Sequence, residues 1–167
     1  RHVADNGRSA SYVGTGAAMT VASRETVRKA IAAGLAASGV LPTAKGNIYD
    51  YMHSSFAGAS PVVRVLSGGS MRPRDTHHGK PSTFYFTIQL WVLYFERGTP
   101  AQQAAAEDTL DALEGEVTAW LGDLDVRNQP GYWRDLSWAQ ASQVAVRQVQ
   151  GHSYIVEDIP IEVTVDG

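Results

Sequence analysis

One short polar stretch holds the residues of this chain that are best suited to chemistry. It contains Asp75 and the adjacent pair His77 and His78, and His53 lies further upstream. Imidazole and carboxylate groups are common zinc ligands and common acids and bases in hydrolases. Adjacent histidines on an extended loop point in different directions, however, and the HExxH spacing of a zinc hydrolase is absent. We therefore expect no metal site. The less favoured alternative is a small metal-dependent hydrolase that uses His77, His78 and Asp75.

Other catalytic signatures are missing from the sequence. The chain has no cysteine, which excludes a disulfide framework, a thiolate zinc site and a cysteine nucleophile. The glycines of Gly14–Gly16 and Gly68–Gly69 are not followed by GK[ST], so we interpret them as turn or flexible glycines rather than phosphate loops. No GxSxG motif marks a serine nucleophile. We expect no catalytic residue, no cofactor and no enzymatic activity.

The same polar stretch is basic and is predicted to form a loop over residues 68–81. Its arginine, histidine and lysine side chains are Arg72, Arg74, His77, His78 and Lys80. Arginine and lysine bind phosphates, so contact with DNA is one interpretation. The 14 Lys and Arg against 17 Asp and Glu give a net charge of -3, which disfavours bulk attraction to nucleic acid. A solvated loop and a loop that contacts an acidic surface of another subunit are the other two interpretations.

Residues 100–122 are predicted to form a long acidic helix. Thr99 can cap it, Pro100 suits the first helical position, and Gln102 can complete a capping box. The spacing predicts a buried stripe of Ala106, Leu110, Leu113, Val117 and Trp120. The opposite side carries Glu107, Asp108, Asp111, Glu114 and Glu116, and no Lys or Arg lies in the segment. Glu107, Asp111 and Glu114, with the five basic-loop residues, are the candidate interface residues.

A first helix is predicted over residues 23–38, with Ser23 as its cap and Gly39 at its end. Strands are predicted over 47–53, 61–67 and 82–96, and strand-like sequence resumes from Asp135 to Val149. The last strand alternates from Ile159 to Val165. Because Pro160 cannot donate to a ladder, this strand should sit at a sheet edge or begin at the proline.

These elements predict one α+β domain over residues 19–167, with a mixed, mostly antiparallel sheet of four to six strands and two main helices packed on it. Residues 1–18 are expected to be a flexible N-terminal arm, or a leader upstream of a natural start at Met19. The longest apolar run, 84–95, is too short to cross a bilayer as a helix, so no membrane span is expected.

Five segments together resemble a known family. They are 56–67 (FAGASPVVRVLS), 84–94 (FYFTIQLWVLY), the acidic helix, 131–136 (GYWRDL) and 151–154 (GHSY), which leads into the last strand. In this order they resemble the tail terminator, or tail completion, proteins of long-tailed bacteriophages, a class of minor tail protein. The similarity spans roughly residues 21–165 and consists of strand, turn and aromatic patterns. The leader 1–18 and the loosely patterned segment 139–150 depart from it.

The resemblance implies a structural virion protein that forms a ring, usually a hexamer, on the last ring of the tail tube. Such a ring stops tube polymerisation and presents the docking surface for the filled head. The implied partners are further copies of the chain, the tail-tube protein and a head–tail connector or stopper, with genomic DNA passing through the lumen without specific binding. The implied location is the neck of the virion tail, after assembly in the host cytoplasm. Another head–tail connector or a baseplate-side tail protein is the closest alternative, because these share small α+β ring-forming subunits.

Overall fold

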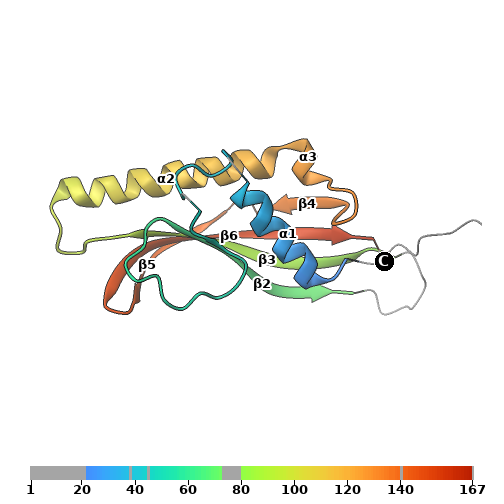
Figure 1. Ribbon diagram of the computed structural model, residues 1–167, viewed down its shortest axis with the longest axis horizontal. Coiled ribbons are helices and arrows are strands. Elements are labelled where there is room, and N and C mark those ends of the chain that lie inside the picture. Colours follow the sequence, from blue (N-terminus) through green and yellow to red (C-terminus); the bar gives the residue numbers. More distant parts are fainter. Residues whose placement is uncertain (1–21, 38, 45, 73–79, 140, 167) are drawn as a thin grey trace, which may run out of the picture.

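The computed structural model describes residues 22–37, 39–44, 46–72, 80–139 and 141–166. It is an α+β fold in which a six-stranded sheet packs against two main helices, as the sequence predicts (Figure 1). The elements follow the chain as α1 Arg24–Ala36, β1 Ile48–Tyr49, β2 Val62–Met71, β3 Ser82–Leu93, α2 Pro100–Gly122, α3 Leu124–Arg127, β4 Asp135–Trp138, β5 Gln143–Val149 and β6 His152–Val165.

Strands β3 and β6 form the centre of the sheet. They pair antiparallel without a break from Ser82 opposite Val165 to Leu93 opposite Tyr154. β2 pairs with the other side of β3, and β4 and β5 pair one after the other along the outer side of β6. β1 runs parallel to β2, so the sheet is mixed.

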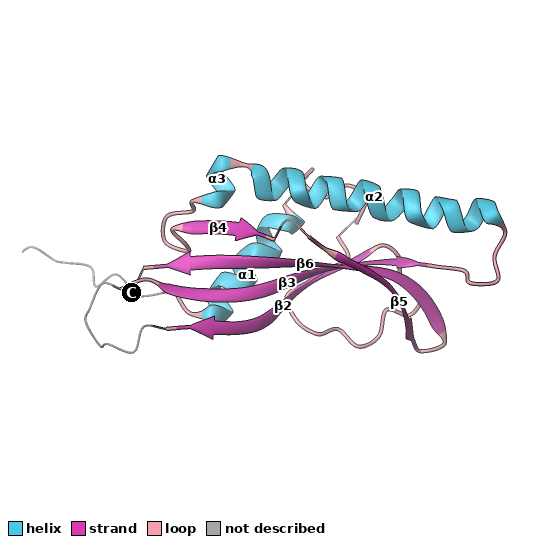
Figure 2. Ribbon diagram, turned by 180° about the vertical axis from the view of Figure 1, so that it is seen from behind, coloured by secondary structure: helices cyan, strands magenta, loops and turns pink. Residues whose placement is uncertain are grey.

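Both main helices pack on one face of this sheet. Figure 1 shows α1 in front of the strands, and Figure 2, seen from behind, shows the strands in front of α1. The predicted caps are present: Ser23 Oγ accepts from the Thr26 backbone N–H at 3.1 Å, and Thr99 and Gln102 form a capping box at the start of α2. The side chains that fill the core between the layers include Ile31, Leu35, Phe84, Phe86, Ile88, Leu90, Leu113, Val117, Ile161 and Val163.

The buried stripe of α2 differs from the prediction at one position. Leu121 is fully buried and completes the stripe, whereas Trp120 is only partly buried. The Trp120 ring lies against Gly34 of α1, where a Cβ atom would come within 2.7 Å of the ring. The tryptophan therefore joins the two helices at a point where glycine lets them approach, instead of packing down on the sheet.

The prediction that a loop begins at Gly68 is wrong, because β2 continues to Met71. The pairing with β3 shifts between Ser67 and Gly69, as it does at a β-bulge. A Cβ atom on Gly68 would lie 3.2 Å from the Tyr85 carbonyl oxygen, so the glycine permits a close approach of the two strands. Gly68 and Gly69 are strand residues rather than turn residues.

The strand predicted over residues 47–53 ends at Tyr49. The chain then leaves the sheet edge and brings Phe56 over the second sheet face, where its ring centroid lies 5.2 Å from that of Trp91 and 5.4 Å from that of Tyr154. After Tyr49 the chain is therefore held by the packing of Phe56 on these rings and not by strand pairing. The alternation of residues in the sequence did not indicate this change.

Pro160 lies within the central strand β6, so the predicted position, at a sheet edge or at the start of the strand, is wrong. Its carbonyl oxygen accepts from the Ala139 N–H at 3.1 Å, which orients the nitrogen of the same residue toward the β4 and β5 side. At this level the outer ladder is interrupted, because β4 pairs with residues 161–164 and β5 with residues 152–158. The missing N–H thus faces the gap between two short strands and breaks no ladder hydrogen bond.

The second sheet face holds a buried arginine that sequence analysis did not single out. Arg64 is only 7% exposed, and its guanidinium carbon lies 4.4 Å from the Trp91 ring centroid and 5.3 Å from that of Phe56. Arg64 donates to the His53 carbonyl at 2.8 Å and to Gln89 Oε1 at 2.7 Å. Burial is the main cause that lowers its pKa, yet an arginine keeps its charge in proteins.

The polar network continues from Arg64 to the sheet edge. Gln89 Nε2 donates to Asp158 Oδ1 at 2.8 Å, and the other oxygen of Asp158 pairs with Arg147 of β5. Four strands are thereby connected through side chains on the sheet face that no described helix covers. No helix among the described residues is long and apolar enough to cross a membrane.

Replacing Arg64 with alanine should lower the free energy of unfolding by about 2–4 kcal/mol, because buried charged hydrogen bonds and two cation–π contacts are lost together. Chemical denaturation measures this. Arg147→Ala is the matched control: its side chain is 40% exposed, so the loss should be at most about 1 kcal/mol. Equal losses in the two variants would contradict the assigned role of Arg64.

Candidate functional site

The structure places five of the eight candidate interface residues. Arg72 is exposed directly after β2, and Lys80 is exposed just before β3. Arg74, His77 and His78 lie outside the described residues. On α2, Glu107 and Asp111 are exposed and Glu114 is partly buried.

The basic and acidic residues lie far apart in the molecule. The end of β2 and the start of β3 are at one end of the sheet, near the C-terminus, whereas α2 begins at the opposite end (Figure 1). Met71 of β2 pairs with Thr83 of β3. Val144 of β5 pairs with Glu157 of β6, which in turn pairs with Leu90 of β3. The strand length from Thr83 to Leu90 is roughly 23 Å at about 3.3 Å per residue.

The five acids of α2 do not form one surface. Glu116 faces the segment after α1, where its carboxylate accepts from the Thr43 backbone N–H at 3.2 Å and also from the Thr43 hydroxyl. Glu107, Asp111 and Glu114 follow each other at spacings of four and three residues, which places them on one flank. This flank is the one that faces β6 and β5, because Glu157 of β6 is close enough to affect the Glu114 carboxyl.

Burial raises the pKa of Glu114, and the negative charges of Glu157 and Asp111 raise it further. All the charges that act on this carboxyl are of its own sign. Glu157 itself is 6% exposed and accepts from the Ser142 hydroxyl, just before β5. The flank therefore holds partly desolvated negative charge that no cation among the described residues offsets.

Strand β5 adds apolar side chains next to this flank. Val144 and Val146 are 57% and 50% exposed, and they pair with Glu157 and Ile155 of β6. Residues directly opposite each other in an antiparallel pair project from the same face, so both valines project on the helix side of the sheet. We call the surface made by Glu107, Asp111, Glu114, Val144 and Val146 the α2–β5 strip.

The outer edge of β5 is open. Among the described strands β5 pairs only with β6, so the backbone N–H and C=O groups on its other side have no ladder partner there. Gln150 and Gly151 connect β5 to β6 with φ angles of 50° and 78°, the left-handed pair that favours a tight two-residue hairpin. Segment 139–150 is loosely patterned in the sequence, and no interface residue is predicted in it, although the sequence contains Val144 and Val146.

The residues considered for metal binding do not come together in the described structure. His53 packs among aromatic rings, 4.4 Å from the Tyr49 ring centroid. Asp75, His77 and His78 lie outside the described residues. In the described ranges no three His, Cys, Asp or Glu side chains are grouped as metal ligands.

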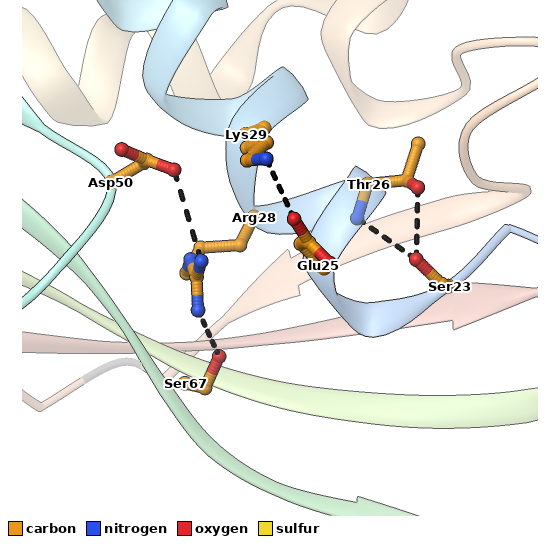
Figure 3. Close-up of polar contacts among 7 residues, drawn as sticks. All are labelled: Ser23, Glu25, Thr26, Arg28, Lys29, Asp50 and Ser67. Atoms are coloured by element: carbon orange, nitrogen blue, oxygen red, sulfur yellow. Dashed lines mark hydrogen bonds and ion pairs between the residues drawn. The ribbon is translucent and has the colours of Figure 1, made fainter.

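Two open depressions lie elsewhere on the surface. The first is bordered by α1 and Tyr132, beside the exposed Lys29–Glu25 ion pair. Figure 3 shows that the neighbouring Arg28 instead points to the sheet, with Nη1 at 3.4 Å from Ser67 Oγ. The hydrogen bond from Arg28 to Ser67 links α1 to β2.

The second depression is lined by residues 93–98 and 151–153 together with Gln102. There the Ser153 hydroxyl donates to Glu96 at 2.9 Å. In the part of the chain that the structure describes, no hydrogen bond joins a hydroxyl of either depression to a histidine.

A comparison of the sequence with protein-family models gives no match. A search of curated proteins likewise finds no significantly similar sequence.

The raised pKa of Glu114 predicts that the free energy of unfolding depends on pH. The folded state keeps this proton to a higher pH than the unfolded state, so the free energy of unfolding falls as pH rises above the ordinary glutamate range. Glu114→Gln should therefore be more stable than the wild type at pH 7 and equal to it below about pH 4. Denaturation at both pH values measures the difference, and Glu107→Gln controls for the loss of one exposed charge. A destabilised Glu114→Gln at pH 7 would contradict this account.

Proposed function

We propose that this chain is a structural subunit that assembles into a ring at the head-proximal end of a phage tail tube. The ring stops tube polymerisation and provides the surface on which the filled head docks. The element order, with an initial helix, a hairpin sheet, a long second helix and a terminal hairpin, is compatible with the tail terminator resemblance. Another head–tail connector is the alternative within the same class.

The observation that carries the proposal is the open strand β5. Proteins that stay monomeric usually protect an edge strand with lysine, proline, a bulge or a covering segment. Residues 143–149 contain no lysine and no proline, and their one charged side chain, Arg147, is paired with Asp158 of β6. The strand exposes Val144 and Val146. Such an edge is stabilised by contact with another chain.

The opposite side of the sheet has a second open edge. β1 pairs only with Val63 and Arg64 of β2, so the outer edge from Val65 to Met71 has no partner strand among the described residues. Two different exposed surfaces on one subunit permit head-to-tail association, which closes into a ring when the rotation between neighbours allows it. This is the form of association that the proposed function requires.

The net negative charge of the chain, -3, suits a ring through which DNA passes. Negative side chains repel the phosphate backbone, so a wall that carries them does not hold the DNA. We propose that duplex DNA is a passing cargo of the ring and not a ligand of the chain.

Negative-stain microscopy of the full chain, alone and mixed with its tail-tube protein, tests the function. We expect rings, or tubes of limited length that are capped at one end. Persistent monomers that leave tube growth unchanged would reject the proposal. Rings that appear only on tube ends still support it, because a subunit with weak self-affinity closes on its template by mass action.

Lysine at the two exposed valines, Val144→Lys with Val146→Lys, should block assembly. A charged edge strand disfavours contact with another chain, and we expect association at least about tenfold weaker. The free energy of unfolding of the monomer should change by no more than about 0.5 kcal/mol, since both positions are exposed. Sedimentation velocity and chemical denaturation measure the two quantities.

Leu124→Lys is the matched control for this pair. Leu124 is 77% exposed but lies in α3, away from β5, so its replacement should leave association unchanged. Wild-type association of the valine variant would show that β5 takes no part in assembly.

A further inference from the structure

We infer that neighbouring copies of this chain dock head to tail, with the basic end of one sheet on the α2–β5 strip of the next copy. The basic end comprises Met71, the last residue of β2, and Arg72, which follows it. The inference rests on the proposed function, because it names the two surfaces that join the subunits of the ring.

The α2–β5 strip needs a partner that is both apolar and cationic. Val144 and Val146 expose apolar area beside an open strand edge, and exposed apolar area favours a partner that covers it. Beside them the Glu114 carboxyl is partly desolvated among charges of its own sign. A cation in contact with this flank would offset that repulsion.

The basic end offers the matching chemistry. Met71 is 59% exposed at the last position of β2, and a methionine side chain adapts to an uneven apolar surface. The exposed Arg72 follows it and makes no ion pair with an acid of the described residues. One end of the sheet therefore combines an apolar and a basic side chain, where the strip combines apolar and acidic ones.

The two surfaces of a single copy cannot contact each other. Met71 is level with Thr83 of β3, and the valines of β5 are level with Leu90 and Val92. That separation is roughly 23–30 Å along rigid, paired strands at about 3.3 Å per residue. The complementary surfaces can be satisfied only between copies, and because they differ from each other the contact is heterologous, the type that generates rings.

Charge reversal in the full chain tests the pairing. One variant carries Arg72→Glu, and the other carries Glu107→Lys with Asp111→Lys. All three substitutions are at exposed positions outside the core. Each variant should associate at least about tenfold more weakly than the wild type, because like charges then face each other across the contact. Wild-type association should also weaken as the salt concentration rises.

An equimolar mixture of the two variants should recover association. In the mixture, the acidic end of the first variant meets the lysine-bearing strip of the second, and the basic end of the second meets the acidic strip of the first. Sedimentation velocity, with the tail-tube protein present as template, measures the recovery. Failure to recover, or wild-type association of either variant alone, would overturn the inference.

Site-specific cross-linking keeps the test independent of charge. The chain has no cysteine, so Met71→Cys with Val144→Cys introduces the only two thiols. A short bis-maleimide should join successive copies into a ladder of covalent oligomers. The control Met52→Cys with Val144→Cys uses another exposed methionine, 71% exposed, and should give no ladder. Equal ladders in the two variants would overturn the inference.

The outcomes separate this inference from the proposed function. Rings that form normally from both charge variants would leave the function intact and reject only the pairing. A wild-type chain that never associates, with or without tube protein, would reject the function itself. Duplex DNA binding that is lost in Arg72→Glu while association persists would assign the basic end to nucleic acid and overturn the inference.

Discussion

The pairing of β3 with β6 is the interaction on which the rest of the structure depends. The ladder is unbroken from Ser82 opposite Val165 to Leu93 opposite Tyr154, and every other strand except β1 attaches to one of these two. Side chains on its helix-facing side, such as Phe86 and Ile161, form the apolar sheet surface on which both main helices pack. Because these strands are distant in sequence, the ladder also brings residues 82–93 next to residues 154–165, at the end of the described domain.

A sheet organised around two central strands leaves its interaction surfaces at the periphery. Helices α1 and α2 cover one face, and the aromatic cluster with Arg64 covers part of the other. The surfaces left at the periphery include the open edge of β5 and the end of β2 at Met71. The strand pairing that builds the core also fixes the distance between these two surfaces. A direct contact between the two surfaces therefore requires a second copy of the chain.

Much of the fold is predictable from the sequence because its signals are local. The caps at Ser23 and Thr99 and the alternation in β3 and β6 require no knowledge of distant residues. The errors arise where a distant partner decides: Pro160 is tolerated in a central strand because of a gap between β4 and β5. In the candidate site, sequence identified the acidic helix, but only the register separates Glu116, bound to Thr43, from the flank beside β5.

Native mass spectrometry of the wild-type chain tests the central claim, assembly into a ring, most directly. Spectra are recorded from dilute to concentrated solution, with and without the tail-tube protein. The account predicts that the monomer gives way to one closed homo-oligomer of fixed stoichiometry, a hexamer by the family resemblance. A monomer under every condition, or a series of ever longer oligomers, would contradict it.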